Sequence, residues 1–325
     1  MRSKKILLAN SLLILALILF VLVPIIVNTL FNLGGSLGGD ISLLLSGVTT
    51  VITFGGITLL YCRITKRGFS EVMVIKKISI KQLITIMFVA FGTYIFAVGV
   101  NSVSMKLFPI AIEDGMKISN LLNNSSTLLG LIVVVLVPAF FEEIFFRGVL
   151  LDAYEGLNRK IKYFIITLIF ATFHGNIMQI VYVMFLGFII LKVREYSGSL
   201  VGSMTFHAAN NAISFVLSKV VMIMSATGIK DGVLDPAQVA ATNEVMNASF
   251  IVVILRASLF FLIGGAILFI NLRKLKEYKE KKNGLELEKN NTRIYDKPID
   301  KKQYIPLVIY FVSITLLVIS RYYKI

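Results

Sequence analysis

The chain has little cysteine and few charged residues. Its single cysteine, Cys62, permits neither an internal disulfide nor a thiolate metal cluster, so nothing in the protein depends on an oxidising compartment. Charged residues make up 16% of the sequence and hydrophobic residues 57%, whereas soluble domains have about 25% and about 45–50%. One ordinary core cannot bury this excess of apolar residues. The composition therefore excludes a soluble enzyme, a disordered tail protein and a disulfide-stapled secreted module, and it indicates a polytopic membrane protein.

Long apolar stretches predict an all-α fold, a polytopic transmembrane bundle of about eight to nine helical spans. Most stretches approach the about 20 residues that cross about 30 Å of hydrocarbon as a helix. Two stretches are shorter, 161-175 and 177-192. They form either two spans joined by a tight turn or a hairpin whose turn stays below the far surface. The stretches are 6-28, 41-62, 83-105, 127-151, 161-175, 177-192, 199-222, 249-271 and 304-320.

The basic residues alternate between the loops. Of the 33 Lys and Arg residues, 25 lie in the N-terminus and in every second loop, six in the intervening loops and the C-terminus, and two inside spans. By the positive-inside rule, the N-terminus and the basic loops are expected to be cytosolic, and loops 29-40, 106-126 and 223-248 to face outward. This distribution accounts for the net charge of +15 without nucleic acid as a partner.

Ionisable residues inside a span are functional candidates, because burying each charge in the membrane costs about 2.5–3.5 kcal/mol. The fourth stretch contains Glu142, Glu143 and Arg147 among four phenylalanines. Glu143 and Arg147 are four residues apart and share a helical face, whereas Glu142 is rotated from Glu143 by about 100°. The arginine can therefore hold one carboxylate ionised while the other carboxylate points elsewhere.

Both histidines of the chain also lie in apolar stretches, where His174 ends the fifth and His207 lies in the seventh. Asn211 follows His207 by four residues and shares its face. Counted from the predicted cytosolic ends at 1.5 Å per residue, Glu142 lies about 15 Å deep, His174 about 20 Å and His207 about 12 Å. We therefore expect three spans to form one polar cavity inside the membrane.

These motifs resemble those of the CPBP family of intramembrane endopeptidases, which includes type II CAAX prenyl proteases and Abi-like proteins that process bacteriocins or confer self-immunity. The three family signatures stand here in order, each on its own predicted span. They are Glu142-Glu143-x-x-x-Arg147, Phe170-x-x-x-His174 and His207-x-x-x-Asn211. The resemblance covers about residues 120-225, and the ninth stretch goes beyond the eight-helix core of the family.

The resemblance implies a membrane endopeptidase in which Glu142 activates a water as general base and His174 orients or polarises that water. His207 and Asn211 would stabilise the tetrahedral oxyanion. The residues fit this chemistry, because hydrolysis needs an activated water, a proton donor for the amine and donors for the oxyanion. A carboxylate among phenylalanines loses solvation, which makes it a better proton acceptor.

Two points of the chemistry stay open at this level. Spacing alone does not fix which glutamate is the base, although Glu143 and Arg147 most simply form a supporting ion pair. No cofactor is required, but a zinc ion is an alternative, and its ligands would be Glu142, His174 and His207. A glutamate-activated water is the preferred mechanism because Asn211 is a poor zinc ligand and no His-Glu-x-x-His motif occurs.

The chain divides into five segments on these patterns. They are an N-terminal three-span region (1-110), the CPBP-like catalytic core spans (120-225), an outer loop with the eighth span (226-271), a basic cytosolic linker (272-303) and a C-terminal span (304-325). The linker is most simply a solvated loop beside anionic lipid headgroups.

The expected partners are the lipid bilayer and a hydrophobic or membrane-associated peptide or protein substrate. The richness in Ile, Lys and Asn suggests a bacterial plasma membrane, where bacteriocin processing is one role for such an enzyme. Two other functions remain open. One is a non-proteolytic scaffold or bacteriocin self-immunity protein, and the other is a proton-coupled transporter, for which the expected internal repeat is not found. The sequence does not indicate the oligomeric state.

Overall fold

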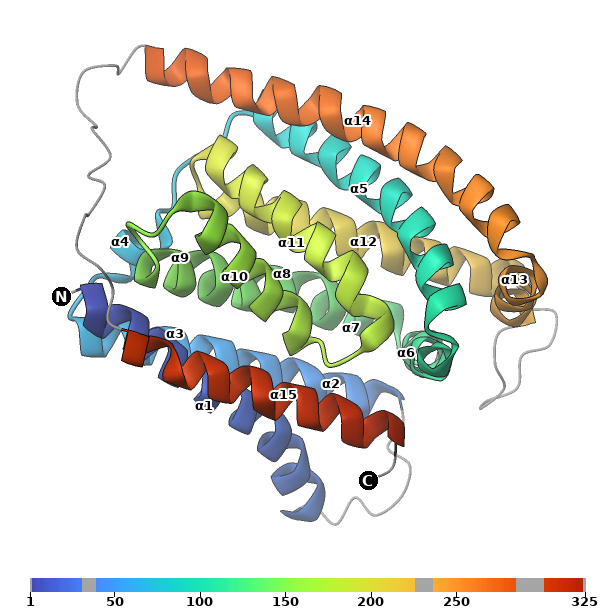
Figure 1. The fold of residues 1–325 in the computed structure, drawn as a ribbon, viewed down its shortest axis with the longest axis horizontal. Coiled ribbons are helices and arrows are strands. Elements are labelled where there is room, and N and C mark those ends of the chain that lie inside the picture. Colours follow the sequence, from blue (N-terminus) through green and yellow to red (C-terminus); the bar gives the residue numbers. More distant parts are fainter. Residues whose placement is uncertain (1, 31–38, 226–235, 285–300, 324–325) are drawn as a thin grey trace.

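The protein is a bundle of helices that run roughly side by side (Figure 1). The computed structural model describes residues 2–30, 39–225, 236–284 and 301–323, and every regular element within them is a helix. This confirms the predicted all-α fold. The elements are α1 (Arg2–Leu30), α2 (Gly39–Thr50), η1 (Val51–Gly55), α3 (Gly56–Thr65), α4 (Phe69–Met73), α5 (Ile80–Leu107), η2 (Pro109–Ala111), α6 (Ile112–Asn123), α7 (Thr127–Gly130), η3 (Leu131–Leu136), α8 (Val137–Glu143), η4 (Ile144–Val149), α9 (Leu150–Ala153), α10 (Arg159–Phe173), α11 (Ile177–Ser197), α12 (Leu200–Ser225), α13 (Pro236–Asn247), α14 (Phe250–Gly284), η5 (Lys301–Tyr304) and α15 (Ile305–Tyr323).

Six helices or continuous helical rods in the described part of the chain are long and apolar enough to cross a membrane. Two of them are composite, because α2, η1 and α3 form one rod and the elements from α7 to α9 form another. The six are Lys4–Leu30, Gly39–Thr65, Ile80–Leu107, Thr127–Ala153, Phe250–Lys281 and Lys301–Tyr322. They agree with six of the predicted apolar stretches.

Helices α10, α11 and α12 cover the other three predicted stretches. Helix α10 has 15 residues, so it rises by only about 22 Å, less than the about 30 Å of the hydrocarbon layer. Its length favours the predicted hairpin whose turn lies below the far surface. Helix α11 returns from that turn and α12 runs on beside it.

The rod from α7 to α9 lies in the middle of the bundle (Figure 1). Helices α1 and α15 pack against each other along one edge, and α5 and α14 along the opposite edge, while α12 packs against both η3 and α8. Phenylalanine rings fill the space beside η4, and Phe54 contacts both Phe145 and Phe146. The rod that carries the two glutamates is therefore enclosed by other helices.

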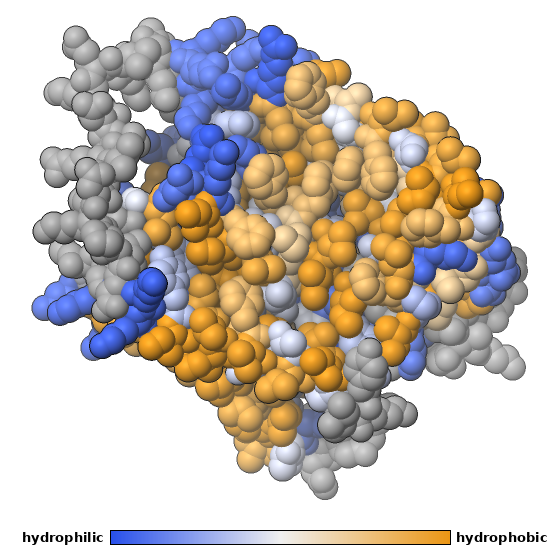
Figure 2. All heavy atoms as spheres, in the orientation of Figure 1, coloured by the Kyte–Doolittle hydropathy of each residue, from blue (hydrophilic) through white to orange (hydrophobic). Residues whose placement is uncertain are grey.

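The surface is apolar over the middle of the molecule. Figure 2 shows hydrophobic side chains across this region and hydrophilic ones gathered towards the ends of the helices. Large apolar side chains on α14 face outward, among them Ile251 at 72% and Leu262 at 70% exposure. Such a band suits contact with lipid, whereas soluble monomers rarely expose contiguous apolar patches larger than a few hundred Å².

The basic loops meet at one end of the bundle. Lys5 and Arg67 both form ion pairs with Asp152, and the hydroxyl of Tyr61 donates to the same carboxylate at 2.6 Å. These contacts bring the N-terminus, the loop after α3 and the end of α9 together, as the alternation of charge predicts. On the same side, α14 continues to Gly284. The first part of the predicted linker is therefore helical, while residues 285–300 of the linker and 226–235 of the predicted outer loop lie outside the described residues.

Candidate active site

The central rod changes its helical register on both sides of the two glutamates. The π-helices η3 and η4 flank the α-helical segment that ends at Glu143. Single π-helical turns occur frequently at functional sites. Pro138 follows η3 and has no N–H to donate to the carbonyl of Val134, four residues earlier. The side-chain amide of Asn211 on α12 donates to this carbonyl at 3.0 Å, so α12 is fixed to the rod about two turns before Glu142.

A buried ion pair lies directly behind the site. Oε1 of Glu143 accepts from Nη1 of Arg147 at 2.9 Å and from Nδ1 of His207 at 3.0 Å. The side chains of Glu143 and Arg147 are 0% exposed. Because a carboxylate only accepts hydrogen bonds, His207 donates through Nδ1 and its Nε2 remains for other chemistry.

Arg147 is held on all sides by groups that suit a buried cation. Its guanidinium carbon lies 4.1 Å from the ring centroid of Phe170, a cation–π contact, and Nη2 donates to the carbonyl of Gly187 at 3.5 Å. A Cβ at position 187 would lie 3.1 Å from the Phe170 ring and 3.3 Å from a methyl group of Thr167. Glycine therefore permits the close approach of α11 to the arginine.

His174 lies at the C-terminal end of α10. Its Nδ1 donates to the carbonyl of Phe170 at 2.8 Å, which leaves Nε2 without the proton in a neutral ring. Gly175 follows in the left-handed region at a φ of +61°, and this conformation ends the helix. The ring of His174 is exposed. It is therefore accessible from outside the protein.

Glu142 lies beside His207. Its Oε2 is 4.0 Å from Nε2 of His207. The side chain of Glu142 is 16% exposed, although Oε2 itself is buried and, like Oε2 of Glu143, has no hydrogen-bond partner among the described residues. Glu142 and its neighbour Glu143 thus differ in access, since only Glu142 can be reached from outside the protein.

Helix α15 supports the end of α10 that carries His174. Tyr310 is fully buried, its hydroxyl lies 3.1 Å from the hydroxyl of Thr172, and it donates to the carbonyl of Ile169 at 3.3 Å. The rings of Tyr310 and Phe173 stack with an interplanar angle of 12°. The C-terminal span is therefore part of the wall that holds the histidine.

The structure brings the predicted site residues together. Glu142, Glu143, Arg147 and His207 are linked by direct contacts, and the ring of Phe170 contacts the rings of both His174 and His207. Asn211 lies one helical turn away on the same face of α12 as His207. The contributions of Val134 and Gly187 could not be found from motifs, because both residues act through a main-chain carbonyl. The contribution of Tyr310 could not be found either, because Tyr310 lies far from the motifs in the sequence.

The predicted zinc ligands do not form a metal-ligating group. Among the residues that the structure describes, no three His, Cys, Asp or Glu side chains converge in a way that could hold a metal ion. The donor set of Glu142, His174 and His207 therefore does not fit zinc, and the steps below are derived from the side chains alone.

Comparison with known proteins gives one match. Searches of curated proteins and of solved structures find no match. The model of the family described as type II CAAX prenyl endopeptidase Rce1-like matches residues 124–213, a range that includes all six site residues. This match supports an intramembrane endopeptidase activity of the CAAX type. The segment that carries all six site residues thus resembles a type II CAAX prenyl endopeptidase domain of the Rce1-like family, a likeness consistent with a CPBP family intramembrane protease.

Proposed function

We propose that the protein hydrolyses a peptide bond of a hydrophobic or membrane-associated peptide or protein with a water activated by Glu142. The observation that carries this proposal is the difference between the two adjacent glutamates. Glu143 is 0% exposed and accepts hydrogen bonds from Arg147 and His207 at Oε1, whereas the side chain of Glu142 is 16% exposed. A general base must be within reach of the proton that it removes. Glu142 meets this condition and Glu143 does not.

In the first step, Glu142 accepts a proton from water while the water oxygen attacks the scissile carbonyl carbon. The unprotonated Nε2 of His174 can accept the second hydrogen of that water and so fix its orientation. The products of this step are a protonated Glu142 and a tetrahedral intermediate that carries a negative oxygen. Glu142 then gives its proton to the amine as the carbon–nitrogen bond breaks, which restores the carboxylate.

The oxyanion is stabilised from α12. One N–H of the Asn211 amide is engaged by Val134, and the second is left to donate to the intermediate. His207 donates through Nε2 when its ring is protonated, and the carboxylate of Glu143 at Nδ1 stabilises that positive charge. Arg147 neutralises Glu143 in turn, so the buried ion pair orients the catalytic groups without contact with the substrate.

A buried site suits a substrate that is already in the membrane. The outer surface around the rod is apolar (Figure 2), and Phe140 beside the glutamates is 45% exposed. A hydrophobic segment can therefore approach Glu142 without leaving the lipid. Prenylated proteins, bacteriocin leaders and other hydrophobic peptides all belong to this substrate class.

The decisive experiment is turnover of a fluorogenic hydrophobic peptide by purified, folded Glu142→Gln protein. Glutamine keeps the shape of the side chain but cannot accept the proton, so the rate should fall by at least about 10²-fold, the usual contribution of a positioned base. The matched control is Glu71→Gln, which removes an exposed carboxylate at the end of the bundle and should leave the rate unchanged. Parental turnover by Glu142→Gln would refute the proposed base.

The same preparation tests the metal alternative and the non-proteolytic functions. We expect full activity after exhaustive chelation, and a loss that zinc restores would instead assign a metal mechanism. If the parent protein binds hydrophobic peptides but releases no cleavage product, it acts as a scaffold. Peptide or proton uptake into proteoliposomes without cleavage would identify a transporter.

A further inference from the structure

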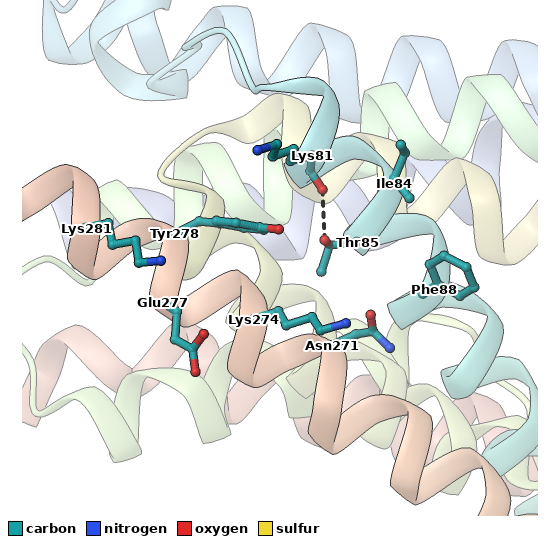
Figure 3. Close-up of a pocket in the computed structure, with 9 residues that line it drawn as sticks. All are labelled: Lys81, Ile84, Thr85, Phe88, Asn271, Lys274, Glu277, Tyr278 and Lys281. Atoms are coloured by element: carbon teal, nitrogen blue, oxygen red, sulfur yellow. Dashed lines mark hydrogen bonds between the residues drawn. The ribbon is translucent and has the colours of Figure 1, made fainter.

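A basic cavity lies between α5 and α14, apart from the candidate active site. It encloses about 660 Å³, and none of the six site residues lines it. Figure 3 shows its lining side chains, with Tyr278 extending from α14 towards α5 and the ammonium of Lys274 beside Asn271. The lining residues are Lys81, Ile84, Thr85, Phe88, Asn271, Lys274, Glu277, Tyr278 and Lys281.

The cavity lies at the boundary between the apolar part and the polar end of the bundle. Lys81 is in the first turn of α5, and Lys274 and Lys281 follow the apolar part of α14. Below them, Ile84 at 51% and Phe88 at 52% exposure continue along the outer wall. Lipid headgroups occupy this level of a membrane, and their acyl chains occupy the level of the two apolar side chains.

The charge of the cavity is unbalanced. Lys81, Lys274 and Lys281 are all exposed, and in the part of the chain that the structure describes none of them forms an ion pair. The single acidic side chain of the lining, Glu277, is engaged by Arg273 at 3.2 Å. Within the described residues, three lysines therefore line the cavity without an ion-pair partner, and the one carboxylate of the lining is paired with Arg273.

The start of α5 adds to the positive potential. This helix has 28 residues, and its N-terminal end carries the positive pole of the helix dipole next to Lys81. Ser79 caps the helix, and Thr85 donates to the carbonyl of Lys81 at 2.8 Å, which keeps the first turn regular. The phenol of Tyr278 supplies a neutral hydrogen-bond donor from the opposite wall.

We propose that this cavity binds the phosphate-bearing headgroup of an anionic phospholipid. The three lysines and the end of α5 recognise the phosphate oxyanion, and Ile84 and Phe88 contact the acyl chain. A free phosphate ion would make the contacts with the lysines and the end of α5 but none with Ile84 and Phe88. Since α5 and α14 each supply part of the cavity, the bound lipid stabilises their contact. This assignment does not depend on the proteolytic function.

Native mass spectrometry of the purified full-length protein tests the proposal. The protein is titrated with phosphatidylglycerol, with phosphatidylcholine as the neutral lipid and with inorganic phosphate. We expect preferential binding of phosphatidylglycerol that phosphate does not displace. A lysine near an anionic headgroup contributes about fivefold in affinity, so Lys81→Gln/Lys274→Gln/Lys281→Gln should weaken binding by about 10²-fold.

The matched control removes the same charge from the same end of the bundle. Lys66, Lys77 and Lys276 are exposed and do not line the cavity, and their triple glutamine variant should bind phosphatidylglycerol as the parent does. If both triple variants lose the same affinity for phosphatidylglycerol, the effect comes from surface charge in general, and the proposal is overturned. Displacement by phosphate would assign the cavity to a soluble anion, and parental binding by the cavity variant would exclude it as a lipid site. A melting measurement confirms that both variants are folded.

Discussion

At the scale of single residues, one helical step separates a buried carboxylate from an accessible one. Glu143 turns into the bundle, where Arg147 and His207 satisfy one of its oxygens, and the side chain of Glu142 stays 16% exposed. The rotation of about 100° per residue in a helix produces this difference. The adjacency of two like charges inside an apolar rod is tolerated because Arg147 neutralises one of them.

Removal of Arg147 should lower the stability of the protein. Arg147→Ala leaves Glu143 as an unpaired buried charge, which destabilises by about 3–5 kcal/mol in comparable pairs. We expect a lower folded yield and a lower melting temperature in detergent. The double variant Glu143→Gln/Arg147→Gln should recover more yield than either single glutamine variant.

Arg256 provides the matched control. It pairs with Glu244 where both side chains are more than half exposed, at 54% and 65%. Arg256→Ala should therefore melt within about 0.5 kcal/mol of the parent, because exposed pairs contribute little. An Arg147→Ala protein that melts like the parent would contradict the structural role of the buried pair.

The amide of Asn211 should have two separable effects. Asn211→Ala removes an oxyanion donor, which lowers the rate by about 10²–10³-fold, and it removes the hydrogen bond to Val134, worth about 1 kcal/mol. Pro138→Ala restores a main-chain N–H to the same carbonyl. The double variant Pro138→Ala/Asn211→Ala should therefore regain melting temperature but not turnover, as measured by thermal unfolding and peptide cleavage. Recovery of both would show that Asn211 acts only on stability.

At the scale of helices, α15 extends the site beyond the matched segment. The hydroxyl of Tyr310 contacts α10 near His174, and its ring stacks on Phe173. Tyr310→Phe keeps the ring but frees the end of α10. We expect a fall in kcat of up to about tenfold, the effect of one lost hydrogen bond of about 1 kcal/mol, with KM unchanged.

Ser320→Ala is the control for this variant. Ser320 lies on the same helix, and its hydroxyl bonds only within α15, to the carbonyl of Leu317. This change should leave kcat at the parental value. Parental kcat for Tyr310→Phe would mean that α15 supports only the fold.

The helices themselves were largely predictable, because apolar length determines which segments can cross a membrane. The two short helical stretches on either side of Gly175 were predictable from their apolar length, and the position of their turn relative to the far surface stays a prediction with two alternatives. The π-helices η1, η3 and η4 were not predictable. Their extra residue per turn depends on the packing of neighbouring helices, and only Pro138 signals that the hydrogen bonding of this rod is irregular.

The site was predictable as a set of residues and not as a set of contacts. Helical spacing placed Arg147 beside Glu143 and Asn211 beside His207, since both pairs are four residues apart. The contact of His207 with Glu143 joins residues 64 apart, and the support from Tyr310 crosses 138 residues to Thr172. Such contacts follow from tertiary packing, which periodicity does not contain.

At the scale of the whole molecule, the basic loops share one end and predict the orientation in the membrane. In a Cys62→Ala background, cysteines at Ser70 and Gly284 should be labelled only from the cytosolic side, and one at Asn124 only from outside. The buried position of the native thiol makes it a poor target in any case. The measurement is labelling by an impermeant maleimide in cells and in inverted vesicles. Labelling of Ser70 and Asn124 from the same side would contradict the arrangement of the spans.

The short α10 also determines how far a substrate has to reach. Its 15 residues separate the basic end of the bundle from His174 by about 22 Å. A peptide that enters from that end as an extended chain needs about six or seven residues to cover this distance, at about 3.4 Å per residue. The same peptide in a helix needs about fifteen, and its carbonyls are then occupied by hydrogen bonds. If the protein cleaves peptides as proposed and they enter from that end, this distance favours unwound segments over helical ones.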